Sequence, residues 1–583
     1  MKKFLSMALV IAMVGSLAAC GSSSSGSSSE ESTSAPAASA TSKADATTLN
    51  VYLSSEPAHL DPALNSSVDG ACLAANSFEG LYRYNSDGEL EPACAESYEV
   101  SEDGMTYTFT LKDGLKWSNG EPLDASDFEY SWKRAASPDT AADYNYLCEV
   151  FGDKFSYEEG LADDAVVASE DGKTLTVTLG SVCPYFLDLA AFPFFFPVYE
   201  ESVEGTKTDS VPTGTWANDA CEEYVCNGAY VLQTWNHDSD MVYVKNENYW
   251  DADSVTVETL NYMLTSNTTS AYTAYQSGDL DFIDEIPVDE TAAAMTSDEF
   301  KIIDELGTYY VGFNYNSDLY ENLGLDEEQA KVFRHALCLL IDRQYIIDTV
   351  GQTGQVPANT FIPAAAADGN GGTFEEGTEG YFTAASTDEE YQANVEEAKE
   401  LLASIGLWDQ DAQALTQDVS FTYLINTADN HIKIAESMQA DFAQLGINMT
   451  IDQQEWNVFL DTRKNGDFDI AREGWVMDYN DPINMLEMWM TDSGNNDCQF
   501  GRDESKSLDW SAYDEFIGSI RQEADTAKRA ELMHQAEDML MDTWCVVPVY
   551  YYNDPYMVKN YVDGIYGTAL GTKYFYHATI TAE

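Results

Sequence analysis

Residues 419–455 read VSFTYLINTADNHIKIAESMQADFAQLGINMTIDQQE, and this stretch decides the fold class. Apolar and polar residues alternate over 419–425, which predicts a strand, and residues 447–451 predict a second one. Between them, apolar residues recur at the helical spacings of three and four, at Ile434, Met438, Phe442 and Leu445, and Gly446 predicts the end of that helix. A strand, a helix and a strand in so short a segment form a βαβ crossover with parallel strands, which predicts an α/β protein.

A candidate binding site follows from the same pattern. Residues 468–472 predict a third strand nearby. In open α/β sheets, ligands bind outside the carboxyl ends of the strands. His431, Trp456 and residues 474–478 lie just beyond such ends. We therefore expect these residues to line a ligand site.

Strand and helix periodicities both recur along the rest of the chain. Alternating patterns predict strands at 106–111, 174–179, 241–245 and 255–264. Helical patterns follow later, at 332–340, 389–405 and 527–541. The mixture of β-rich and α/β regions predicts several lobes around one cleft.

Composition excludes some classes of protein. The 583 residues include 28 Lys and Arg against 101 Asp and Glu, a net charge of −73, so nucleic acid is not an expected partner. Hydrophobic residues make up 44 %, which excludes disorder for the bulk of the chain. Of the ten cysteines, Cys221 and Cys226 are close enough in sequence to form a disulfide, but the sequence does not assign the pairing.

The N-terminus predicts export. Lys2 and Lys3 precede an apolar stretch at 4–14, as in a secretory signal peptide. The small residues that end at Cys20 resemble the lipobox of bacterial lipoproteins, so we expect a signal peptide over 1–20 and a lipid on Cys20. Residues 21–48 are rich in Ser, Ala and Thr, which predicts a disordered tether. The expected location is the outer face of the cell membrane, or the periplasm if the source has an outer membrane.

Motifs for catalysis are missing from the sequence. The six histidines are isolated, no HExxH or CxxC occurs, and the only dense Gly/Ser run lies in the tether. We therefore expect no enzyme activity, no catalytic residue, no metal ligand and no cofactor.

Five ordered blocks of sequence resemble one protein family. From residue 49 to the C-terminus the chain resembles the oligopeptide-binding lipoproteins of bacterial ABC importers, within the peptide/nickel class of extracellular solute-binding proteins, family 5. The blocks are 55–62 (SEPAHLDP), 115–132 (LKWSNGEPLDASDFEYSW), 227–250 (from NGAY to KNENYW), 456–482 and 547–552 (VPVYYY).

The resemblance implies a fold and a function. The fold is α/β and periplasmic-binding-protein-like (class II/cluster C), with two hinged halves built from three lobes around a ligand cleft. The implied function is to capture peptides, as a monomer, and to deliver them to the permease subunits of an ABC transporter. The alternatives are a receptor of the same fold for another solute (a sugar, a nickel chelate or haem) or a sensor of signalling peptides. The implied lobes are lobe I at about 49–78, 197–305 and 547–583, lobe II at about 79–196, and lobe III at about 306–546.

The same resemblance implies a set of ligand-binding residues. Asp478 occupies the position whose carboxylate receives the amino terminus of the peptide, and Gly474 and Trp475 flank the peptide backbone. Arg463 and Arg472 match basic positions that meet the carboxy end or bridging waters. Ordinary alternatives remain: Asp478 could cap a helix, Trp475 could belong to the core, and each arginine could pair with a nearby acid, Asp461 or Asp469.

Three further positions complete the implied site. Tyr144 matches a ligand-side tyrosine, Trp456 lines the cleft, and His431 lies near a similar position, although the helix there differs by one residue in length. Tyr144 and Trp456 could instead be packing residues, and His431 an ordinary residue at a helix start. The chain departs from the family's pattern at Ser66, where oligopeptide binders have an acid, and this puts the ligand length in doubt.

Overall fold

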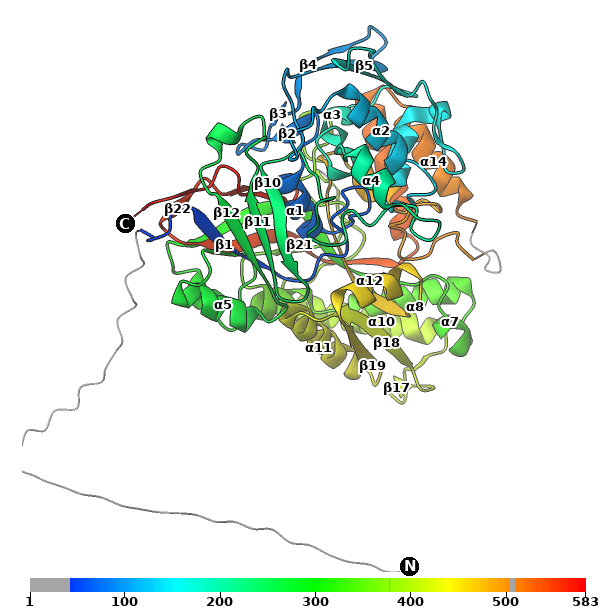
Figure 1. Ribbon diagram of the computed structural model, residues 1–583. Helices are drawn as coiled ribbons and strands as arrows, with labels where there is room; N and C mark the ends of the chain where they lie inside the picture. The colour runs from blue at the N-terminus through cyan, green and yellow to red at the C-terminus, as the bar shows by residue number, and fades with distance from the viewer. Residues whose placement is uncertain (1–41, 377, 504–508, 583) are drawn as a thin grey trace, which may run out of the picture. The chain divides into compact units, whose positions relative to one another are not determined.

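The computed structural model describes residues 42–582, apart from 377 and 504–508 (Figure 1). The predicted signal peptide, the lipid attachment site Cys20 and most of the predicted tether lie outside the described residues. Residues 42–48, which the sequence assigns to the end of the tether, pack on the folded part. Lys43 pairs with Ala582 in a parallel β-bridge, and its Nζ lies 2.5 Å from Asp281 Oδ2. The folded part therefore begins a few residues before Leu49.

One large mixed sheet contains eleven of the strands in the described part of the chain. Its order is β10-β11-β12-β1-β13-β21-β14-β20-β18-β19, and β15 also pairs with β21. The bounds of these strands are β1 Thr48–Leu53, β10 Tyr230–Asn236, β11 Asp240–Lys245, β12 Thr259–Leu264, β13 Phe282–Ile283, β14 Phe300–Phe313, β15 Val356–Pro357, β18 Ser420–Asn426, β19 Asn448–Gln454, β20 Ile470–Val476 and β21 Val546–Val558.

The βαβ crossover predicted from residues 419–455 is confirmed. Strand β18, helix α11 (Asp429–Ala443) and strand β19 follow one another, and β18 pairs in parallel with β19 from Ser420–Asn448 to Asn426–Gln454. The helical residues singled out by their spacing are buried. Strand β20 also pairs in parallel with β18, so the carboxyl ends of these strands meet at one edge. Because β20 runs to Val476, residues 474–476 end this strand, whereas the sequence predicted that they lie beyond it.

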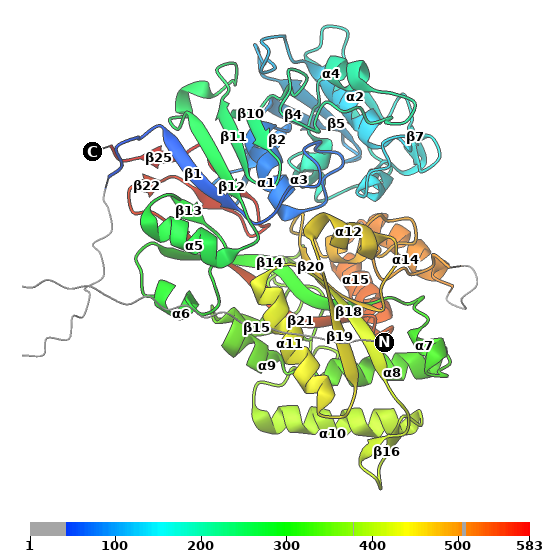
Figure 2. The same cartoon turned by 60° about the horizontal axis from the view of Figure 1, so that its bottom comes forward.

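Two long strands, β14 and β21, lie next to each other in the middle of the large sheet. Strand β14 pairs with both β20 and β21, and β21 also pairs with β13 and β15 (Figure 2). Between Asp304 and Thr308 the register of β14 against β21 shifts, which marks an irregularity in the ladder. The predicted boundaries between lobes I and III, at 305/306 and 546/547, fall inside these two strands. The division into lobes stays a prediction.

A second sheet lies within residues 95–178. Its order is β4-β5-β9-β8, and helix α2 (Ala125–Ala135) contacts β8 and β9. The alternation predicted at 106–111 and 174–179 places Phe109 and Leu175 in the core, where both are buried. Trp132 of α2 is also buried, and its Nε1 donates to the carbonyl oxygen of Phe195 at 2.7 Å. The strands are β4 Ala95–Val100, β5 Thr106–Leu111, β8 Val166–Ala168 and β9 Thr174–Thr178.

The remaining elements are helices and short strands around these sheets. The helices are α1 Val68–Ser77, α3 Phe186–Leu189, α4 Glu200–Thr206, α5 Thr268–Ser277, α6 Thr291–Ala294, α7 Leu319–Asn322, α8 Glu327–Leu339, α9 Arg343–Ile346, α10 Asp388–Ser404, α12 Trp456–Lys464, α13 Ile483–Glu487, α14 Ser511–Arg521 and α15 Thr526–Met541. The strands are β2 Tyr82–Tyr84, β3 Leu90–Pro92, β6 Phe155–Ser156, β7 Gly160–Leu161, β16 Trp408–Asp409, β17 Ala414–Leu415, β22 Val562–Asp563, β23 Tyr566–Gly567, β24 Lys573–Tyr574 and β25 Thr579–Ile580.

The described cysteines are all free, so the possible bridge between Cys221 and Cys226 is not formed. Among the described residues, no helix has the length and apolar character that crossing a membrane requires.

Candidate ligand site

A cavity of about 610 Å³ opens at the carboxyl ends of the parallel strands. Its walls come from segments that are far apart in the sequence, among them β20, the start of α12, residues 65–75 and β24. Every ligand-site residue predicted from the sequence lines this one cavity: Tyr144, His431, Trp456, Arg463, Arg472, Gly474, Trp475 and Asp478. Whether they bind a ligand stays a prediction.

Asp478 lies just after β20 and is held by neutral hydrogen-bond donors. The hydroxyl of Tyr144 donates to its Oδ1 at 3.0 Å, and the side-chain amide of Asn484 donates to its Oδ2 at 2.8 Å. No described lysine or arginine forms an ion pair with it. Burial raises the pKa of Asp478 to about 7, although both hydrogen bonds act in the opposite direction. Asp478 is therefore a carboxylate at the cavity wall without a counter-charge, and it caps no helix, because α13 begins only at Ile483.

Asn484 holds Trp475 and Asp478 in place by hydrogen bonds. Its Oδ1 accepts hydrogen bonds from the Asp478 amide and from Trp475 Nε1, both at 3.0 Å. The Trp475 ring lies 6.1 Å from the ring of Tyr144, between centroids. Gly474 lies beside Tyr552, and a Cβ at this position would clash with the Tyr552 hydroxyl. The segment 474–478 therefore presents a tightly packed wall to the cavity.

Arg472 is a half-buried cation on β20. Among the described residues, no carboxylate forms an ion pair with it, and its Nε is buried without a hydrogen-bond partner. Its guanidinium carbon lies 5.6 Å from the centroid of the Tyr309 ring. The alternative that Arg472 pairs with a neighbouring acid is not what the structure shows.

Arg463 on α12 differs from Arg472, because two carboxylates already neutralise it. Its Nη1 lies 2.6 Å from Glu473 Oε2, and its Nε lies 2.9 Å from Asp497 Oδ2. These partners differ from the acids Asp461 and Asp469 that the sequence suggested. A salt-bridged guanidinium is less available to a ligand than one without a partner.

His431 and Trp456 lie further along the cavity. His431 is buried near the Tyr309 ring, and burial, together with the charge of Arg472, holds its pKa well below the ordinary value. The imidazole is therefore neutral, and its Nδ1 has no hydrogen-bond partner. Trp456 begins α12 and stacks on Phe459 with a centroid distance of 5.7 Å. Neither side chain brings charge to the cavity at neutral pH.

Sequence reasoning missed an acidic cluster in the same cavity. Lys573 Nζ lies 2.7 Å from Asp554 Oδ2 and 3.3 Å from Asp284 Oδ2. Glu285 and Glu305 line the cavity as well, and burial raises the pKa of each to about 8. No signal in the sequence could single out these acids, because the chain contains 101 Asp and Glu and these come from distant segments.

Ser66 stands where the family's pattern has an acid, and in the structure it contacts an acid from another segment. The Ser66 hydroxyl donates to Asp143 Oδ2 at 3.0 Å, and Asp143 also forms an ion pair with Lys464. An acid thus lies beside position 66, although it comes from another part of the chain.

Comparison with known proteins gives consistent matches. The model of the bacterial extracellular solute-binding proteins, family 5, middle, matches residues 89–497. The oligopeptide-binding protein OppA of Bacillus subtilis is 34 % identical over 541 residues, which cover 91 % of this chain and 92 % of that protein.

Solved structures agree with these matches. The Escherichia coli murein tripeptide binding protein MppA superposes with a TM-score of 0.79 and 27 % identity, and the match covers 93 % of this chain and 99 % of that one. For Listeria monocytogenes OppA bound to peptide, the TM-score is 0.78 and the identity 26 %, with 92 % and 100 % covered. The predicted α/β, periplasmic-binding-protein-like fold class is confirmed.

Proposed function

Because the chain belongs to family 5 of the bacterial extracellular solute-binding proteins, we propose that it captures peptides outside the cell membrane and delivers them to an ABC importer. The family consists of binding proteins, so the chain is not an enzyme. The proposal includes the permease subunits as partners, a monomeric receptor, and a lipid on Cys20 that keeps it at the membrane.

One observation carries the proposal: the cavity contains the Asp478 carboxylate and the Arg472 guanidinium, and neither forms an ion pair with a described residue. The Asp478 carboxylate would accept hydrogen bonds from the ammonium group of a peptide, and the Arg472 guanidinium would donate hydrogen bonds to the carboxylate of the peptide. Charge-assisted hydrogen bonds of this kind contribute about twice as much as neutral ones. A receptor that holds the two charged ends and the backbone tolerates many side chains, which suits peptide uptake.

The spacing of the two groups suggests a ligand length. Arg472 and Asp478 are six positions apart along β20 and the residues that follow it. At a rise of about 3.3 Å per residue, their Cα atoms lie at most ~20 Å apart. An extended peptide has a similar rise, so we propose ligands of at most about six residues.

The acidic cluster suggests a preference for basic peptides. Asp284 and Asp554 form ion pairs with Lys573 at the cavity wall, and Glu285 and Glu305 lie at the same wall. Burial keeps Glu285 and Glu305 largely protonated at pH 7, and a Lys or Arg side chain of the ligand would favour their ionised forms, whereas an acidic side chain would not.

Thermal unfolding with a panel of ligands tests the proposal. A ligand that binds only the folded chain stabilises it by about 2.7 kcal/mol at a hundredfold excess over Kd. Peptides of up to about six residues with free ends should raise the unfolding temperature, basic ones most. If a sugar or a nickel chelate raises it and no peptide does, the alternative of another solute replaces the proposal.

A further inference from the structure

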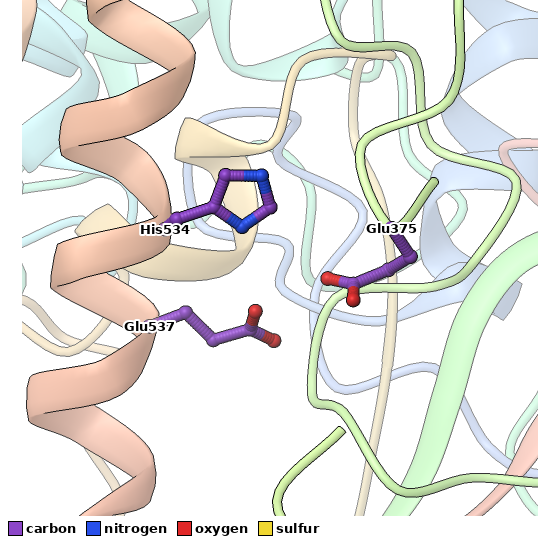
Figure 3. A group of neighbouring side chains, drawn as sticks. All are labelled: Glu375, His534 and Glu537. Carbon is purple, nitrogen blue, oxygen red and sulfur yellow. The ribbon is translucent and has the colours of Figure 1, made fainter. Parts of the chain in front are cut away.

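Three metal-ligating side chains converge at a place outside the ligand cavity. His534 and Glu537 lie one helical turn apart on α15, and Glu375 faces them from a loop (Figure 3). One ligand atom of each residue lies within 4.8 Å of the other two. None of the three residues lines the ligand cavity.

Glu537 is a buried carboxylate held in a fixed orientation. Only 1 % of the residue is exposed. Its Oε1 accepts hydrogen bonds from the backbone amides of Phe361 and Ile362, at 3.0 and 2.9 Å. Both backbone amides donate to the same oxygen of the Glu537 carboxylate. Figure 3 shows this carboxylate directed toward Glu375.

Glu375 supplies the second observation. Its Oε1 is buried, and none of the described amide, amine or hydroxyl groups donates to it, while its Oε2 accepts from the Thr378 hydroxyl at 2.5 Å. Within the described part of the chain, no lysine or arginine forms an ion pair with Glu375 or Glu537. Two facing carboxylates repel each other unless a proton or a cation lies between them.

We propose that Glu375, His534 and Glu537 bind a divalent first-row transition-metal ion, with Zn²⁺ as the probe. One imidazole nitrogen and two carboxylate oxygens suit zinc, whereas Mg²⁺ and Ca²⁺ prefer oxygen ligands alone. Ligand atoms of a tetrahedral zinc ion lie about 3.3 Å apart, given Zn–N and Zn–O distances near 2.0 Å. Closing the site from 4.8 Å to that spacing would require the Glu375 and His534 side chains to rotate, and their partial exposure leaves a fourth position for water.

The bound ion would brace the wall behind the ligand cavity. It would link α15 to the loop that contains Glu375. The same loop contacts the residues that follow the cavity-lining segment 474–478, because the Ala367 amide donates to Asn480 Oδ1 at 2.9 Å. Helix α15 contacts the next residue, since Arg529 Nη1 lies 2.7 Å from Asp481 Oδ2. The expected effect of the metal is therefore on the stability of this region.

Matched histidine variants provide the test. His534 stacks on Phe374 with a centroid distance of 3.8 Å, and His335 stacks on Trp544 in the same way at 3.7 Å. Among the described residues, His335 belongs to no group of three metal-ligating side chains. His534→Phe removes the ligand nitrogen and keeps a ring on Phe374, and His335→Phe makes the same change where no site exists.

Zn²⁺ titration of the chelator-stripped full chain by calorimetry, with excess Mg²⁺ to occupy surface acids, gives the readout. The wild-type chain and His335→Phe should bind one Zn²⁺ more tightly than His534→Phe does, by at least about tenfold. Glu375→Gln should show the same loss, and it decides the matter if His534→Phe does not fold by circular dichroism. Equal Zn²⁺ binding in all four proteins would overturn the proposal. It would also be overturned if the wild-type chain bound no Zn²⁺ in the presence of excess Mg²⁺, because a shared proton would then hold the carboxyl groups of Glu375 and Glu537 together. Peptide binding is not part of the readout, so this outcome does not depend on the proposed function.

Discussion

Asp478 is the residue whose protonation sets the charge of the proposed amine site. Its carboxylate is bound by Tyr144 and Asn484, which are neutral, and burial raises its pKa to about 7. Only the ionised form attracts an ammonium group. Below pH 7 a growing fraction of the free protein is protonated, so the affinity for a peptide must fall as the pH falls.

The affinity for a peptide should therefore depend on pH through the ionisation of Asp478. Between pH 7 and pH 5 the affinity of the wild-type chain should fall by up to about tenfold per pH unit. Tyr144→Phe removes a hydrogen bond that lowers the pKa of Asp478, so its loss of affinity should begin at a higher pH. Isothermal titration calorimetry at several pH values measures both. A pH profile that Tyr144→Phe leaves unmoved would contradict the assignment of Asp478 as the titrating group.

At the scale of elements, the site depends on the crossover β18–α11–β19. Helix α11 is fixed by buried residues such as Ile434, Met438 and Phe442, and it contacts both β18 and β19. His431 lies in its first turn and lines the cavity. The packing of this helix therefore positions part of the cavity wall.

Truncation of a buried residue of α11 should destabilise the chain. Met438 is 1 % exposed, and Met438→Ala should lower the free energy of unfolding by about 2–5 kcal/mol, because it leaves a cavity. Glu436→Ala, on the exposed face of the same helix, should change it by less than about 0.5 kcal/mol. Denaturant unfolding measures both. Equal effects of the two substitutions would mean that this helix face does not pack as described.

Elements were easier to predict than the detailed site. Periodicity identified the crossover and several other strands and helices, because local burial patterns produce it, and the family resemblance identified eight of the residues that line the cavity. Periodicity cannot show long-range ion pairs: Arg463 turned out to pair with Glu473 and Asp497. Periodicity also does not indicate which acids lie close together in the fold. The sequence therefore did not single out the acids around Lys573 from the 101 Asp and Glu residues.

At the scale of the whole molecule, the described fold and the predicted N-terminal segment have separate tasks. The fold contains the cavity, and the predicted lipid on Cys20 would hold it at the membrane next to a permease. Cys20→Ser should release the protein into the medium or leave an unprocessed precursor. Cell fractionation measures this, and unchanged membrane attachment of the variant would contradict the predicted anchor.

The central claim is that Asp478 holds the amino terminus of a peptide. Calorimetry on four combinations tests it most directly: the wild-type chain and Asp478→Asn, each with a peptide that has a free amino terminus and with its N-acetylated form. Loss of the charge-assisted bond costs about 1.5–3 kcal/mol, so the substitution should weaken binding of the free peptide by about tenfold or more. Acetylation should weaken binding to the wild-type chain strongly and to Asp478→Asn much less. If acetylation weakens binding to both proteins equally, Asp478 is not the ligand of the amine and the account of the site is wrong.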